Sequence, residues 1–74
     1  MPKGDVETYH EHGQWKNKIE GDIGDVGTYF LRDEAIGQGR KLAIDAKVEH
    51  IIRRVDGTIG ERNIYGNNSR DVTG

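Results

Sequence analysis

The 74-residue sequence contains no cysteine, only one serine and no long hydrophobic run. Without cysteine the chain has neither disulfide bonds nor thiolate zinc sites. No window is apolar enough to span a membrane, and no apolar stretch near the N-terminus resembles a signal peptide. We therefore expect a cytoplasmic protein that makes no membrane contact. Because Ser69 is the only serine and no Gly-x-Ser-x-Gly arrangement exists, we expect no enzymatic activity.

The net charge and the fraction of hydrophobic residues are also small. The chain has 11 Lys and Arg residues against 13 Asp and Glu residues, which gives a net charge of −2. This balance disfavours a strongly electrostatic nucleic-acid binder. Only 32% of the residues are hydrophobic, so the core must be thin. We expect a single small domain over residues 1–74, with an ordered core at about 6–66 and flexible termini, for which self-association would add burial.

The N-terminal part predicts a β-hairpin. Residues 6–12 alternate loosely, with His10 and His12 on the same face. Gly13 is a turn residue, and residues 15–20 are predicted as the return strand. Residues 21–27 have the glycine- and aspartate-rich composition of a loop. Residues 28–30 are expected as a short extended piece that leads into a helix.

The central part predicts an amphipathic helix from residue 31 or 32 to residue 46. Its apolar stripe is formed by residues at positions i, i+4, i+7 and i+11, which are Ala35, Gly39, Leu42 and Ala46. Because Gly39 lies on the buried stripe, it permits a close approach between the helix and a sheet. Ile44 lies nearly opposite the stripe and is expected to be exposed.

The C-terminal part predicts a second hairpin. Residues 48–55 are the strongest predicted strand, and Asp56-Gly57 is a favoured two-residue type I′ turn. Residues 58–63 return, with Ile59 pointing inward. The expected fold class is therefore α+β: a single antiparallel sheet, in the chain order β-β-α-β-β, with one helix packed on one face. The order of the strands within the sheet stays open.

Four segments together resemble a known family. They are RDEAI (32–36), GRKLA (39–43), VDGTI (55–59) and ERNIYGN (61–67). With Tyr9 and Trp15 in the first hairpin, they resemble the small bacterial and phage family catalogued as domain of unknown function 2188 (DUF2188). The resemblance covers roughly residues 9–68 and supports the expected fold. It implies no activity, because the function of that family is unknown.

Histidines offer one candidate ligand site. His10 and His12 can share a metal ion because they face the same side of a strand, and His50 is a third candidate if its strand lies adjacent. No acidic partner can be assigned to them. We therefore expect no metal site and no cofactor, and we interpret the three as surface histidines.

A second candidate is a basic and aromatic surface. Its members lie in the first hairpin, the second hairpin and the tail: Trp15, Arg53, Arg54, Arg62, Tyr65 and Arg70. A small sheet with arginines and aromatic side chains can hold single-stranded nucleic acid. Cross-strand ion pairs, such as Arg54 with Glu61, explain the same arginines structurally.

The favoured interpretation is a non-enzymatic interaction domain that binds a protein partner or itself, as a homodimer. A thin core and open sheet edges favour pairing with another chain. Trp15 and Tyr65 are candidate anchors of such a contact, because Trp and Tyr are frequent in binding hot spots. Binding of single-stranded nucleic acid through the second hairpin is the alternative.

Overall fold

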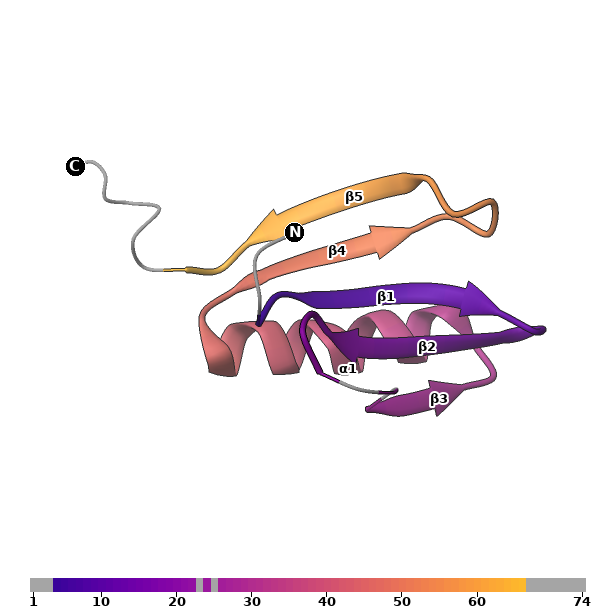
Figure 1. Ribbon diagram of the computed structural model, residues 1–74, viewed down its shortest axis with the longest axis horizontal. Coiled ribbons are helices and arrows are strands. Elements are labelled where there is room, and N and C mark those ends of the chain that lie inside the picture. The colour runs from indigo at the N-terminus through magenta and orange to yellow at the C-terminus, as the bar shows by residue number, and fades with distance from the viewer. Residues whose placement is uncertain (1–3, 23, 25, 67–74) are drawn as a thin grey trace.

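The computed structural model describes residues 4–22, 24 and 26–66. Its elements, in chain order, are β1 (Val6–Glu11), β2 (Gln14–Ile19), β3 (Gly27–Tyr29), α1 (Arg32–Ala46), β4 (Glu49–Arg53) and β5 (Ile59–Ile64). The strands form one five-stranded sheet in the spatial order β3-β2-β1-β4-β5, and α1 lies across one face (Figure 1). The α+β class is confirmed. Within the described residues, no helix has the length and apolarity needed to cross a membrane.

The sheet is mixed, so the prediction of a purely antiparallel sheet was wrong. β1 and β4 are parallel, with Val6 opposite His50, whereas the other neighbouring strands are antiparallel. The reason is the path of α1, which crosses one face and returns the chain beside β1. The predicted β-β-α-β-β order also lacked one strand, β3, which lies between the first hairpin and the helix. The extended piece at residues 28–30 contributes to β3, which places Tyr29 opposite Trp15 at one edge of the sheet.

Both hairpins form where they were predicted, but the type I′ geometry lies in the other one. His12 (φ 53°) and Gly13 (φ 78°) connect β1 to β2, and positive φ angles at both central residues are typical of a type I′ turn. Strand β1 therefore ends at Glu11, one residue before the predicted limit. Between β4 and β5, only Gly57 has a positive φ, at 92°.

The β4–β5 turn is a three-residue loop, so the two-residue prediction was wrong. The N–H of Gly57 donates to the carbonyl of Arg54 at 2.9 Å, and the N–H of Arg54 donates to the carbonyl of Thr58 at 2.8 Å. Residues 54–57 therefore form a β-turn, and its last residue, Gly57, has a left-handed backbone. Asp56 stabilises the loop, because its Oδ1 accepts from the N–H of Thr58 at 3.0 Å. A register shift follows, and Ile59 is 42% exposed instead of pointing inward.

Helix α1 occupies the predicted residues. It begins after Leu31, whose side chain makes no capping bond, and Asp33 and Glu34 stand favourably in the first turn. It ends at Ala46, and the next residue, Lys47, has a left-handed backbone and donates its N–H to the carbonyls of Ala43 and Ile44 in the last turn. Ile44 is 47% exposed, as predicted.

The core between α1 and the sheet is thin and partly polar. Its buried apolar residues are Val6, Trp15, Ala35, Ala43 and Ile52, whereas the buried Ile51 lies on the opposite face of the sheet. Three buried polar residues, Thr8, Asn17 and His50, lie beneath the helix, whereas the buried Glu7 lies on the opposite face of the sheet. The helix contributes mainly small residues to this interface, namely Ala35, Gly39 and Ala43. Small residues bring the helix axis close to the sheet, so the side chains of Thr8, Asn17 and His50 lie directly beneath Gly39.

Candidate functional site

A buried polar cluster, formed by Thr8, Asn17 and His50, lies beneath the helix. The three residues come from β1, β2 and β4, and all three are fully buried. The Thr8 hydroxyl lies 2.5 Å from Oδ1 of Asn17 and 2.7 Å from Nε2 of His50. Strand pairing brings them together. Thr8 of β1 is opposite Asn17 of β2, and Val6, which precedes Thr8 on the same face of β1, is opposite His50 of β4.

The hydrogen bonds of this buried polar cluster determine where its protons lie. Thr8 has one hydroxyl proton and donates it to Asn17 Oδ1, so its oxygen accepts from Nε2–H of His50. The Asn17 amide in turn donates to the carbonyl of Ala35 in α1 at 2.9 Å. A continuous chain of hydrogen bonds therefore runs from β4 through β1 and β2 to the helix.

His50 is neutral in this arrangement. Its Nδ1 is buried and accepts no hydrogen bond within the described residues, so a second proton there would gain no partner. Burial lowers the pKa of His50 below its usual 6.5, and the positive charge of Arg40 lowers it further. The carboxylate of Glu61 acts in the opposite direction and raises the pKa.

A histidine beside a hydroxyl has the geometry of a general base and a nucleophile. Here no substrate can reach the pair, because both side chains have 0% exposure and Gly39 lies directly above them. The cluster therefore joins the helix to the sheet. Sequence reasoning missed Thr8 and Asn17, although their alternation places both on the helix-covered face below the predicted close approach at Gly39.

The three candidate metal ligands do not meet. His10 packs edge-on against Trp15 with ring centroids 5.0 Å apart, whereas His12 lies in the hairpin turn with an 82% exposed side chain. His50 lies in the core, so its prediction as a surface histidine was wrong. Residues 4–22, 24 and 26–66 contain no group of three or more His, Cys, Asp or Glu residues that could hold a metal ion.

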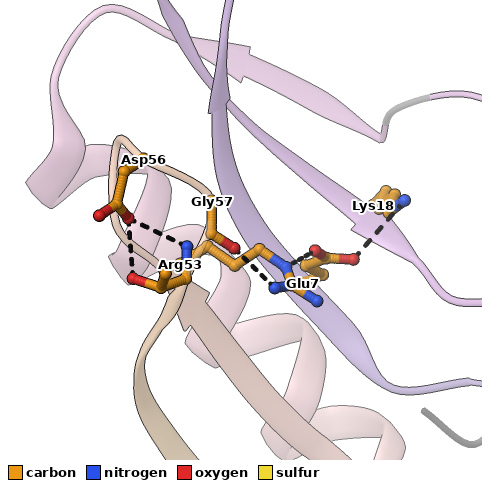
Figure 2. Close-up of polar contacts among 6 residues, drawn as sticks. Glu7, Lys18, Arg53, Asp56 and Gly57 are labelled. Carbon is orange, nitrogen blue, oxygen red and sulfur yellow. Dashed lines mark hydrogen bonds and ion pairs between the residues drawn. The ribbon is translucent and has the colours of Figure 1, made fainter.

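The sheet face opposite α1 carries an ion-pair network centred on Glu7. Arg53 Nε contacts Glu7 Oε2, and Lys18 Nζ lies 3.6 Å from Glu7 Oε1. Arg53 also donates from Nη1 to the carbonyl of Gly57 at 2.8 Å, which ties the β4–β5 loop to β1 (Figure 2). Since the Glu7 side chain is only 7% exposed, Arg53 and Lys18 are the cations that pair with it at this nearly buried position.

The other candidate arginines are also engaged within the chain. Arg54 Nη1 donates to Thr58 Oγ1 at 3.2 Å and to the carbonyl of Ile59 at 3.3 Å. Arg62 Nε lies 3.5 Å from Oε1 of Glu49 on the neighbouring strand. Cross-strand ion pairing, the structural interpretation of these arginines, therefore accounts for Arg62. Arg70 lies outside the described residues.

The two candidate aromatic anchors lie far apart in the sheet. Trp15 on β2 is 9% exposed, and the Arg32 guanidinium lies 5.8 Å from its ring centroid. Tyr65 follows β5, is half-buried, and donates its N–H to the carbonyl of Val48 at 3.3 Å. Strands β1 and β4 separate β2 from β5, so the structure does not bring the two aromatic residues together.

Strand β5 is the long edge of the sheet. Among the described residues it has a neighbour on one side only, whereas the opposite edge, β3, is three residues long (Figure 1). Ile59 and Ile64, at its two ends, are 42% and 55% exposed. Sequence reasoning missed this surface, because which strand lies at an edge depends on the strand order.

A squalene–hopene cyclase of Zymomonas mobilis subsp. mobilis is 26% identical to this chain over 68 residues. The match covers 92% of the chain but only 10% of the length of that protein. No solved structure matches the chain significantly.

A protein-family model matches almost the whole fold. The matched segment, residues 5–65, runs from the residue before β1 to the residue after β5. It contains Thr8, Asn17, Gly39 and His50, and also the first hairpin and the Asp56-Gly57 turn that carried the sequence resemblance. The chain therefore belongs to the family described as "Uncharacterized protein conserved in bacteria (DUF2188)".

Proposed function

We propose that this chain is a non-enzymatic interaction domain that binds an extended protein segment by adding it as a strand to the outer edge of β5. The observation that carries this proposal is that β5 is a six-residue edge strand whose residues are mostly exposed. An edge strand presents a row of backbone donors and acceptors that another chain can pair with.

The orientation of the peptide groups along β5 follows from its pairing with β4. Tyr65 donates its N–H to Val48, and Asn63 and Ile64 lie opposite His50 and Glu49. Antiparallel ladders alternate, so Asn63, like Tyr65, turns its backbone groups toward β4. The N–H and C=O of Arg62 and Ile64 therefore point away from the sheet.

The residues that could support catalysis do not favour an enzyme. Among the described residues, the histidine–hydroxyl pair is fully buried and no metal-binding group exists. The arginines at positions 53, 54 and 62 contact groups of the same chain. These internal contacts also weigh against the alternative of single-stranded nucleic-acid binding, which would have to compete with them.

The proposal is tested by selecting random ten-residue peptides from a display library against the whole chain. Ile64→Pro removes an outward N–H without affecting the β4–β5 ladder, whereas Ile64→Thr keeps the N–H and the strand. We expect the selected peptides to bind the wild type and Ile64→Thr, and to lose binding to Ile64→Pro. Selection of peptides that bind all three forms equally, or of none, would overturn the proposal.

Nucleic acid is a separate arm of the same experiment. Because Trp15 is buried, its fluorescence would report poorly on a surface ligand, and the label belongs on the probe. Fluorescein-labelled oligo(dT) and oligo(U) are titrated at low and high salt. We expect no salt-sensitive change in anisotropy, whereas a salt-sensitive change that disappears in Arg54→Gln/Arg62→Gln would favour the nucleic-acid alternative.

A further inference from the structure

We infer that a second copy of this chain can occupy the β5 edge, with the two β5 strands antiparallel about a two-fold axis that passes beside Asn63. This inference rests on the proposed function, since it names the strand that the edge accepts. It follows from three features of β5: the alternation of its backbone groups, the positions of its charges, and its place in the sheet.

The backbone alternation restricts the registers. When two copies of β5 pair antiparallel, residues with outward N–H and C=O groups must lie opposite one another to exchange hydrogen bonds. With Asn63 on the axis, Arg62 of each copy lies opposite Ile64 of the other, and both residues point outward. Two hydrogen-bonded pairs then form, and Asn63 faces its own counterpart in the non-hydrogen-bonded pair between them.

Charge separates this register from those centred on Arg62 and Glu61. Moving the axis to Arg62 would place two guanidinium groups directly opposite each other, and moving it to Glu61 would do the same for two carboxylates. Like charges directly opposite in a sheet are destabilising. With Asn63 on the axis, each Arg62 lies opposite an isoleucine and keeps its ion pair with Glu49 of its own copy, at 3.5 Å.

The same register covers exposed apolar surface. Ile64 is 55% exposed, and in this register the aliphatic part of Arg62 from the second copy lies against it. On the same face lies Ile51, which pairs with Arg62 and is fully buried. Because Glu49 lies opposite Ile64 and Ile51 lies opposite Arg62, the Glu49–Arg62 pair of each copy passes between its Ile51 and Ile64. The exposed apolar side chains that approach each other across the axis are therefore the two Ile64 side chains.

The unequal edges favour a closed pair over an open chain. Edge strand β3 has three residues, against six in β5, so β3 of one molecule offers a poor match for β5 of another. Pairing of β5 with itself uses the same patch on both copies and closes after two. The helix does not obstruct this approach, because α1 packs on β1, β2, β3 and β4.

Cross-linking tests the register. Because the chain has no cysteine, Asn63→Cys introduces a single thiol on the two-fold axis. Opposed residues in a non-hydrogen-bonded pair have Cα atoms about 4.5 Å apart, within the range that a disulfide spans. We expect Asn63→Cys to form a disulfide-linked dimer under mild oxidation. Glu61→Cys, on the same face but opposite Tyr65 of the second copy, is the matched control and should stay monomeric. Equal cross-linking of both would overturn the register.

Sedimentation equilibrium tests whether a second copy of the chain binds at the β5 edge. We expect the wild type and Ile64→Thr to dimerise as concentration rises, and Ile64→Pro to raise the dissociation constant at least about tenfold, since two inter-strand hydrogen bonds are lost. A dimer that forms equally well in all three would place the contact elsewhere and overturn the inference. A wild type that remains monomeric while its β5 edge binds selected peptides would overturn the second copy as occupant and leave the proposed function standing.

Discussion

Gly39 of α1 lies directly above His50 of β4, so closely that a β-carbon at position 39 would stand 2.6 Å from the imidazole Nε2. The same β-carbon would lie 2.8 Å from Asn17 Oδ1 and from Thr8 Oγ1. The helix can therefore approach the buried polar cluster only because this position has no side chain.

Substitution of this glycine should be costly. We expect Gly39→Ala to lower the free energy of unfolding by about 1–3 kcal/mol, because the added methyl group forces the helix away from three hydrogen-bonded atoms. Gly37 is the matched control, since nothing lies within 4 Å of its β-carbon position. Gly37→Ala should stabilise the chain by up to about 1 kcal/mol through helix propensity. Urea unfolding followed by circular dichroism measures both, and equal effects of the two substitutions would contradict the close approach.

The Thr8 hydroxyl is the centre of the buried polar cluster, so its removal should affect two partners. Thr8→Val preserves shape but leaves Asn17 Oδ1 and the His50 Nε2–H without their shared partner. We expect a loss of about 1–3 kcal/mol of stability. Thr28→Val, on the exposed side of β3, removes the same hydroxyl outside the core and should change stability by less than about 0.5 kcal/mol. A Thr8→Val variant as stable as the wild type would show that the cluster contributes nothing to the fold.

His50 should make stability dependent on pH. Because its pKa is lowered in the folded chain, the unfolded chain binds a proton first as the pH falls through 6.5. The contribution of neutral His50 is therefore fully present above that value and is lost progressively below it. We expect urea midpoints to fall from pH 7 toward pH 5, and His50→Gln to flatten that part of the profile.

His12→Gln is the control for this pH profile, because the His12 side chain is 82% exposed. It should leave the dependence on pH unchanged. If His50→Gln and the wild type lost stability in parallel, other groups would be responsible for the acid sensitivity.

The two arginine–glutamate pairs should differ in importance. Arg53→Gln leaves the nearly buried Glu7 with Lys18 as its remaining cation in Figure 2, and we expect a cost of about 1–3 kcal/mol. Arg62→Gln breaks a pair whose side chains are 51% and 31% exposed, and it should cost about 0–1 kcal/mol. Thermal unfolding at low salt compares the two variants, and a larger loss for Arg62→Gln would contradict the assignment of Glu7 as the buried partner.

Local sequence patterns predicted the helix and the two hairpins. The direction in which β1 and β4 pair depends on the tertiary fold, which these patterns do not encode. The apolar stripe around Ala35 and Gly39 gave the limits of α1, and the glycines at 13 and 57 located both hairpin turns. The parallel pairing of β1 with β4 depends on the side of β1 to which the helix returns the chain. That choice has no marker in residue alternation, so the predicted sheet was antiparallel.

The candidate site was harder to predict because its residues are of polar types. Thr8, Asn17 and His50 are polar, and such residues are often exposed. They fit in the core beneath the helix only because Gly39 has no side chain to collide with them. Arg53 was predicted as part of a ligand surface, but it contacts Glu7, and the two are 46 positions apart in the sequence. Such long-range partners become recognisable once the strand order is known.

Amide hydrogen exchange along β5 tests most directly whether its outer edge is a binding surface. In dilute protein, the outward N–H groups of Arg62 and Ile64 should exchange much faster than those of Glu61 and Asn63, which face β4. Raising the protein concentration, or adding a selected peptide, should slow exchange at Arg62 and Ile64 and leave Glu61 and Asn63 unchanged. Exchange at Arg62 and Ile64 that stays fast under both conditions would contradict the account.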